Sequence, residues 1–180
     1  PSTRPLIAID YAHMRADGTW IGINEEVLDW SQVLSTHLVG VDAGNGAMFS
    51  TAVERKGEQQ FTSAFVCSWL KCYGYRDIDL QFDGEGPLIT TANAIIKRRN
   101  ADGVMTRPVQ IAEYSHEKNG VIERNIRTWQ NIFRALRFHV ELNAKVKLTP
   151  EDDIWAWIGR HAAFLKTRFV VRASGRTSYQ

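Results

Sequence analysis

The stretch that most restricts the fold is a long helical pattern from Ser115 to Leu142. Its apolar residues recur at alternating steps of four and three, which is the spacing of one face of an α-helix. These residues are Ile122, Ile126, Trp129, Phe133, Leu136 and Val140. Because such a face must be removed from water, the pattern predicts a long helix with one side in the core.

A polar stripe runs along the same predicted helix, about 95° from the apolar one if each residue turns by about 100°. It consists of Glu123, Arg127, Gln130, Arg134 and Arg137. One carboxylate therefore lies at the edge of the core, on a face that is otherwise basic. Two interpretations are open for Glu123. It is either an ordinary first-turn residue that pairs with Arg127, or a metal-binding carboxylate that needs others from elsewhere in the chain.

Composition sets broad limits on the kind of protein. The chain has 180 residues, of which 44% are hydrophobic and 23% charged, so it is the size of one globular domain with a substantial core. Its net charge of +2 is too small to indicate nucleic acid binding by itself. No apolar run is long enough to span a bilayer and no signal peptide is present, so no membrane association is expected. The sequence begins at Pro1 without a Met, and we expect a piece of a longer polypeptide.

The cysteines and histidines do not predict a zinc site. Cys67 and Cys72 are five residues apart in one helical segment, a spacing that suits neither a disulfide nor a zinc pair. The five histidines are scattered and never fall in a paired metal-ligand spacing. No structural zinc is therefore expected.

The order of predicted elements is strand, strand, strand, helix, strand, helix, strand, helix, helix, which is a mixed α/β pattern. The strands are predicted at 6–11, 38–42, 47–53, 78–83 and 109–112, and the helices at 57–73, 87–99, 115–142 and 150–165. Residues 16–37 are predicted as an insertion or long loop, with a short helix at 25–33. The 57–73 helix is expected to bury Phe61, Phe65, Trp69 and Cys72.

Carboxylates follow two of these strands. Asp10 ends the first strand and Asp83 the fourth, so both emerge together if these strands are neighbours, and the long helix can bring Glu123 to them. Clustered carboxylates repel one another unless a divalent cation neutralises them. Oxygen-only ligands suit Mg²⁺ or Mn²⁺. Asp42 is a competing ligand candidate, although it enters a hairpin turn, where Asp is common.

Three segments resemble the motifs of retroviral and retrotransposon integrase cores. They are Ile-Asp-Tyr-Ala-His at 9–13, Gln-Phe-Asp-Gly at 81–84 and Ser-His-Glu-Lys-Asn-Gly-Val-Ile-Glu-Arg at 115–124. The segment 153–180 is also similar to the one that follows the core in copia-type retrotransposons. The resemblance implies a ribonuclease H-like fold, a mixed five-stranded sheet flanked by helices. It further implies a catalytic core at 1–145 and a C-terminal helical extension at 146–180.

The resemblance also implies a function and its residues. Asp10, Asp83 and Glu123 would form the catalytic triad and hold two Mg²⁺ or Mn²⁺ ions, for trimming DNA 3′ ends and joining them to target DNA. DNA would be the substrate and the binding partner. The candidate phosphate and backbone contacts are Lys118, Asn119, Arg124 and Arg127. The location implied for such a polyprotein product is the nucleus and a cytoplasmic virus-like particle.

Holding two DNA ends needs more than one active site, so the resemblance implies at least a dimer. Trp155 or Trp157 is expected at the interface, because only one side of their helix can face its own core. Two other functions stay open. One is a different ribonuclease H-like nuclease, and the other is an inactive or domesticated element-derived domain that binds DNA or protein without catalysis.

Overall fold

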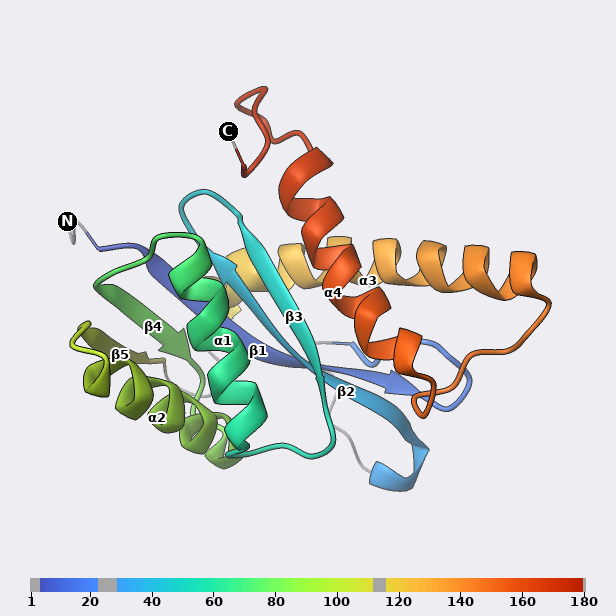
Figure 1. The fold of residues 1–180 in the computed structure, drawn as a ribbon, viewed down its shortest axis with the longest axis horizontal. Helices are drawn as coiled ribbons and strands as arrows, with labels where there is room; N and C mark the ends of the chain where they lie inside the picture. Colours follow the sequence, from blue (N-terminus) through green and yellow to red (C-terminus); the bar gives the residue numbers. More distant parts are fainter. Residues whose placement is uncertain (1–3, 23–28, 112–115, 180) are drawn as a thin grey trace.

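A five-stranded mixed sheet forms the centre of the computed structural model, which describes residues 4–22, 29–111 and 116–179, with only the backbone for 116–119. The strand order is β3-β2-β1-β4-β5 (Figure 1). The first three strands are antiparallel, and β4 and β5 run parallel to β1. Their bounds are β1 Leu6–Arg15, β2 Val33–Asp42, β3 Met48–Val53, β4 Ile78–Phe82 and β5 Thr106–Gln110. The predicted element order and the mixed five-stranded sheet are confirmed.

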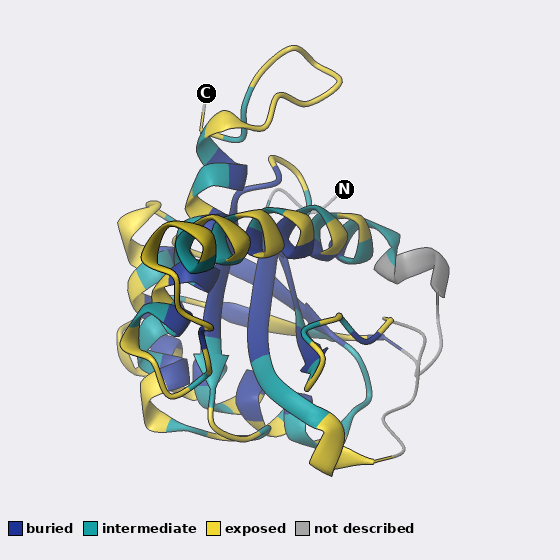
Figure 2. Ribbon diagram, turned by 90° about the vertical axis from the view of Figure 1, so that its right-hand side faces the viewer, coloured by how far each residue is buried: buried dark blue, intermediate teal, exposed yellow. Residues whose placement is uncertain are grey.

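Helices cover both faces of this sheet. Their bounds are α1 Gln60–Cys72, α2 Gly86–Ala101, α3 His116–Ala144 and α4 Asp153–Phe169. One core cluster joins the sheet to α1 and α2, and a second joins its other face to α3 and α4. Figure 2 shows α3 lying across the strands with its buried side towards them. Ile122, Ile126, Trp129 and Phe133 are buried as the spacing predicted, because this face lies on the sheet.

The first strand is longer than the sequence predicted. It continues through Asp10 to Arg15, and β2 begins at Val33, because the two strands pair in register from Ile7 opposite Asp42 to Arg15 opposite Val33. The predicted loop is therefore shorter. Part of the short helix expected at 25–33 lies outside the described residues, and a 3₁₀ turn, η1, covers Trp30–Gln32.

The buried face of α1 was predicted only in part, because Phe65 and Trp69 pack against the core from its rim but Phe61 and Cys72 do not. Phe61 is 56% exposed and Cys72 is exposed, whereas Val66, Cys67 and Leu70 are buried. Two stripes of this helix share the same period, and hydrophobicity alone favoured the aromatic one. The structure buries the smaller side chains between the sheet and α2, and it leaves the aromatic rings at the rim.

The C-terminal helix belongs to the same core as α3. Trp155, Ile158 and Ala162 pack in the cluster that contains the buried face of α3, and Trp129 Nε1 donates a hydrogen bond to the Gly159 carbonyl at 2.9 Å. The helix starts at Asp153, after a turn in which Thr149 N donates to the Asp152 carboxylate, and not at Pro150 as predicted. The division into 1–145 and 146–180 stays a prediction. Within the ranges that the structure describes, no helix has the length and apolar character needed to cross a membrane.

Gly40 allows β2 and β3 to pair around a buried ring. It is opposite Phe49, and a Cβ built on Gly40 would lie 2.2 Å from that ring. Phe49 is buried against Trp69, with ring centroids 5.1 Å apart, so it has little room to move. Gly40→Ala should therefore lower the free energy of unfolding by about 1–3 kcal/mol in chemical denaturation. Adding Phe49→Leu should recover part of that loss, and strictly additive effects of the two substitutions would contradict the clash.

Candidate active site

Asp10 and Asp83 come together through the register of two parallel strands. Ala8 of β1 pairs with Gln81 of β4, and each carboxylate lies two residues further along its strand direction. Since side chains alternate between the two faces of a sheet, Asp10 shares the face of Ala8, which packs in the α3 cluster. By the same alternation, Asp83 follows Phe82, which faces α1 and α2. Both carboxylates therefore point to the face that α3 covers.

The position of Asp10 differs from the prediction in one respect. The residue lies inside β1 and not at its end. However, β4 pairs with β1 only as far as Ala8, so Asp10 lies where its parallel neighbour has stopped. Asp10 therefore has no β4 residue beside it because β4 has ended, and not because β1 ends there as the sequence predicted.

The electrostatics of Asp10 show that the two carboxylates interact. Burial, the neighbouring charge of Asp83 and, to a smaller extent, the charge of Glu85 together raise the pKa of Asp10 to about 7. The hydrogen bond from Tyr11 N to Asp10 Oδ1, 2.7 Å long, and the charge of Lys56 act in the opposite direction. Asp83 Oδ1 accepts a hydrogen bond from Glu85 N at 3.0 Å. Backbone groups thus fix an oxygen of each carboxylate.

Glu123 lies near the start of α3, next to the buried Ile122, and its side chain is 14% exposed. Arg127 Nη2 is 4.0 Å from its Oε2, which is the i,i+4 pair that the sequence suggested. Across the described part of the chain, no three His, Cys, Asp or Glu side chains are close enough together to hold a metal ion. The structure therefore brings Asp10 and Asp83 together without Glu123, and the full triad stays a prediction.

The donor set of this pair fits a divalent cation. Asp10 and Asp83 supply carboxylate oxygens, which are the ligands that Mg²⁺ and Mn²⁺ prefer. The pKa of Asp10 is raised by burial first and by repulsion from Asp83 second, and a bound cation would offset both because it favours the charged carboxylate. Asp42 does not compete for this role: its Oδ1 accepts from Gly44 N and Asn45 N, and its Oδ2 accepts from the Tyr75 hydroxyl. It holds the turn between β2 and β3.

Sequence reasoning missed a cation beside the acidic pair. Lys56, in the loop after β3, forms an ion pair with Glu85 and lies 5.4 Å from the ring centroid of Tyr11 and 4.6 Å from that of Trp30. Glu85 could have been noticed, because it follows Asp83 by two residues. Lys56 could not, since its contacts join loops that no periodic pattern relates.

The predicted DNA-binding residues have different surroundings. The side chains of Lys118 and Asn119 lie outside the described residues. Arg124 is exposed, and its Nε donates to the Gly120 carbonyl at 3.1 Å. The Arg127 side chain is 65% exposed. Arg137, from the same stripe, has a structural role: its Nε donates to Glu141 Oε1 at 2.8 Å and its guanidinium lies over the Trp155 ring at 5.2 Å.

This sheet, with helices on both faces and adjacent carboxylates on β1 and after β4, is a ribonuclease H-like fold. No family model and no curated protein sequence matches the chain. The HTLV-2 integrase catalytic core domain in complex with magnesium aligns with a TM-score of 0.61 and 14% identity in its trimeric form, covering 100% of this chain and 98% of that chain. The dimeric form of the same domain aligns with a TM-score of 0.58 and 12% identity, covering 100% of this chain and 97% of that chain.

A longer relative contains the same fold. A chain of the simian T-cell lymphotropic virus intasome, in complex with the PP2A regulatory subunit B56 gamma, aligns with a TM-score of 0.65 and 14% identity. The alignment covers 99% of this chain and 55% of that one, so the present chain spans about half the length of that protein. At these identities the likeness establishes the fold.

Proposed function

We propose that the chain is the catalytic core of a metal-dependent polynucleotidyl transferase, an integrase that trims DNA 3′ ends and joins them to target DNA. The observation that carries the proposal is the pairing of Asp10 and Asp83 on parallel strands, with the pKa of Asp10 raised to about 7. An acidic pair that costs stability is expected where a cation is to be bound. The likeness to integrase cores, one of them solved with magnesium, supports the same function.

Each residue has a definite role in this proposal. Asp10 and Asp83 would hold Mg²⁺ or Mn²⁺, and Glu123 is the proposed third ligand. When bound, two such ions activate water or a DNA 3′ hydroxyl for attack on a phosphodiester. Tyr11 N and Glu85 N hold one oxygen of each aspartate in a fixed direction. The copia-type origin, and a location in the nucleus and in virus-like particles, are part of the proposal by resemblance.

A plasmid-joining assay separates this function from its alternatives. The chain is incubated with supercoiled plasmid and a labelled duplex oligonucleotide with free 3′ hydroxyls, in Mg²⁺ or Mn²⁺ and in EDTA. An integrase transfers label to the plasmid only when the metal is present. A ribonuclease H-like nuclease of another kind would nick the plasmid without label, and a binding domain would do neither.

A basic residue beside Glu123 is proposed to contact DNA phosphate. Arg127→Ala should weaken DNA binding and lower the slope of log affinity against log salt concentration by about one unit, because one phosphate contact is lost. Arg137→Ala is the matched control from the same helix, and it should reduce stability while leaving the slope unchanged, since Arg137 binds Glu141 and Trp155. Fluorescence anisotropy over a salt series measures both. Equal slopes for Arg127→Ala and the unchanged chain would reject the contact.

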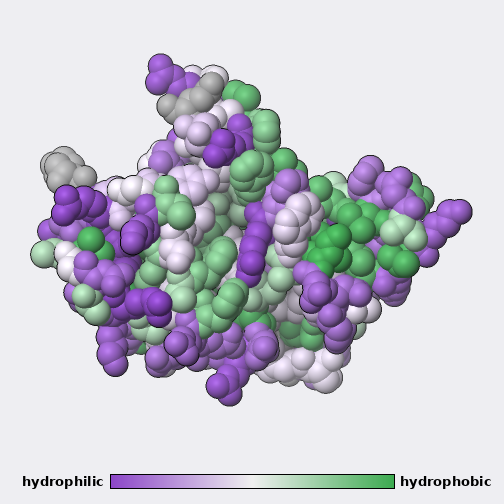
Figure 3. Space-filling model, viewed as in Figure 1, coloured by the Kyte–Doolittle hydropathy of each residue, from purple (hydrophilic) through white to green (hydrophobic). Residues whose placement is uncertain are grey.

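Self-association is proposed to use aromatic residues that α4 and α1 leave exposed. Trp155 is excluded from that role because it is 1% exposed, whereas Trp157 is 51% exposed and stacks on His161 with centroids 4.4 Å apart. Phe61 of α1 is close by, since Arg160 of α4 lies 5.5 Å from its ring centroid. Figure 3 shows hydrophobic side chains among polar ones on the face that carries α1 and α4. Integrase cores similar to this chain have been solved in dimeric and trimeric forms.

Removing this exposed surface should weaken the oligomer. Phe164 is a second exposed ring of α4, at 42%. The double variant Trp157→Ala with Phe164→Ala should lower the association constant at least about tenfold in sedimentation equilibrium, because large aromatic residues dominate interface energies. Phe138→Ala, which removes an exposed ring from α3, is the control. An unchanged association constant in the double variant would place the interface elsewhere.

A further inference from the structure

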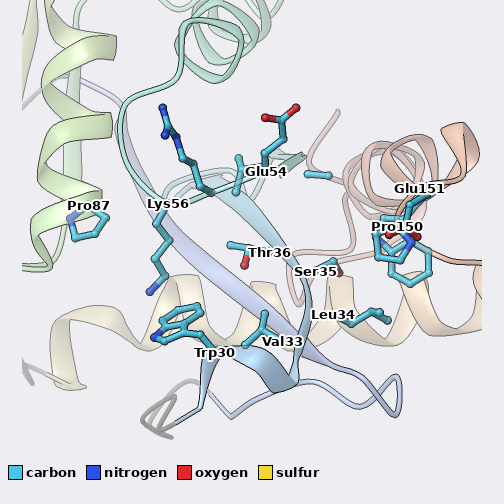
Figure 4. Close-up of a pocket in the computed structure, with 14 residues that line it drawn as sticks. Trp30, Val33, Leu34, Ser35, Thr36, Glu54, Lys56, Pro87, Pro150 and Glu151 are labelled. Atoms are coloured by element: carbon cyan, nitrogen blue, oxygen red, sulfur yellow. The ribbon is translucent and has the colours of Figure 1, made fainter.

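A groove of about 730 Å³ opens next to Lys56, the residue that is ion-paired with Glu85. It runs between the start of β2, the end of β3 and the turn before α4. Figure 4 shows Trp30, Lys56 and Pro87 at one end, Pro150 and Glu151 at the other, and Thr36 between them. The end that holds Trp30 is the one nearest the acidic pair, because Lys56 there is ion-paired with Glu85.

Trp30 is held in place yet half exposed. Asp29 accepts hydrogen bonds from Ser31 N at 3.0 Å and from Ser31 Oγ at 2.7 Å, which fixes the 3₁₀ turn that carries the indole. Lys56 Nζ lies 4.6 Å from the indole centroid, and the His13 ring meets it at 88° with centroids 5.1 Å apart. Even so, 50% of Trp30 is accessible to solvent. An indole fixed by neighbours and still half open is unusual for a residue that serves only the core.

Contacts connect this indole to the acidic pair. Lys56 lies over Trp30 and is ion-paired with Glu85, whose backbone N–H holds Asp83. The charge of Lys56 also acts on Asp10. A nucleic acid strand whose phosphate reaches Asp10 and Asp83 would therefore have a cation and a half-exposed indole in its neighbourhood.

We propose that Trp30 is a stacking platform for an unpaired base of the DNA strand whose phosphodiester lies at Asp10 and Asp83, with Lys56 beside the neighbouring phosphate. The inference rests on the proposed function and adds a DNA subsite to it. An aromatic face next to an ammonium group is the combination that binds single-stranded nucleic acid, because every base has a π-face and every linkage a negative charge. The subsite is thus selective for unpaired over paired DNA and tolerant of base identity.

The test compares two duplexes of equal length, one blunt and one with a short single-stranded overhang that carries 2-aminopurine. The unchanged chain should bind the overhang duplex more tightly and quench the 2-aminopurine fluorescence by stacking. Trp30→Ala should weaken overhang binding about tenfold, with little change for the blunt duplex. Trp30→Phe should keep part of the preference. Phe138→Ala, an exposed ring outside the groove, should behave as the unchanged chain does.

Each contrary outcome has a separate meaning. If the unchanged chain binds both duplexes equally without quenching, or Trp30→Ala keeps the full overhang preference, the stacking platform is wrong and the proposed function stands. If the unchanged chain binds neither duplex, both proposals fail. Thermal unfolding shows whether Trp30→Ala has a folding defect. If it has one, the stacking platform is tested by 2-aminopurine quenching in the unchanged chain alone.

Discussion

Asp83→Asn should abolish plasmid joining, with a loss of at least about a thousandfold in rate. A bound divalent cation contributes several kcal/mol to stabilising charge in phosphoryl transfer, and each 1.36 kcal/mol is about tenfold in rate. The substitution keeps the shape of the side chain and the oxygen that accepts from Glu85 N. The fold should therefore be retained, which circular dichroism and thermal unfolding can verify.

Metal binding gives a second measurement that does not depend on activity. Titrating Mg²⁺ or Mn²⁺ should raise the unfolding temperature of the unchanged chain, because a ligand that binds only the folded state stabilises it. Asp83→Asn should lose this rise, while its stability in EDTA should be equal or higher, since the repulsion with Asp10 is gone. Asp42→Asn is a matched control, a buried carboxylate of the same sheet that holds a turn. It should unfold at a lower temperature and keep the metal response.

A different pattern would remove the site assignment. If Asp83→Asn retained the metal response and Asp42→Asn lost it, the ligands would lie at the hairpin turn. A variant that lost activity but kept the full metal-induced stabilisation would assign Asp83 a role other than cation binding.

Trp129→Ala should destabilise the core more than Gly40→Ala does, lowering the free energy of unfolding by about 3–5 kcal/mol. Trp129 is 0% exposed, and it packs on Trp20 and Phe133 with centroids 4.9 and 5.6 Å apart. Its indole N–H also joins α3 to α4 through the Gly159 carbonyl. The deletion therefore leaves a large cavity and removes the hydrogen bond that the indole N–H donates between the two helices.

Trp129→Phe separates the two contributions. It keeps most of the ring and loses the N–H, so it should cost less than the Ala variant, about 1–3 kcal/mol. Urea denaturation of both variants and the unchanged chain measures the difference. Equal costs for Phe and Ala would mean that the hydrogen bond, and not the packing, holds the two helices together.

Much of this architecture could be predicted from the sequence. The steps of four and three from Ile122 onward identified the buried face of α3, because burial of a helix leaves a periodic signature. The Asn45-Gly46 turn predicted the β2–β3 hairpin, since few residues adopt the required backbone angles; Gly46 has a φ of +76°. The meeting of Asp10 and Asp83 was predicted on the condition that the first and fourth strands are neighbours, which the sheet order satisfies, and the motif resemblance implied the same pair.

The rest depends on tertiary contacts that leave no local pattern. The length of β1 is decided by its pairing with β2, so the Asp10 carboxylate was placed at a strand end that does not exist. The burial of Trp155 depends on where α4 crosses β3 and α3. Lys56 reaches Glu85 and Trp30 only in the folded chain. The distance from the acidic pair to Glu123 depends on where the first turns of α3 lie over the sheet, and the periodicity of a helix does not determine that position.

Under the proposed function, the partly buried Asp10 has a consequence for how such a chain changes over generations. A carboxylate that is disfavoured by burial and by Asp83 lowers the stability of the metal-free protein, so selection for folding and selection for catalysis act against each other at this position. A copy that no longer needs the proposed metal site would gain stability from a substitution that replaces the Asp10 carboxylate by an uncharged side chain. Loss of the proposed activity would then leave well-folded descendants, which can keep a binding role without catalysis.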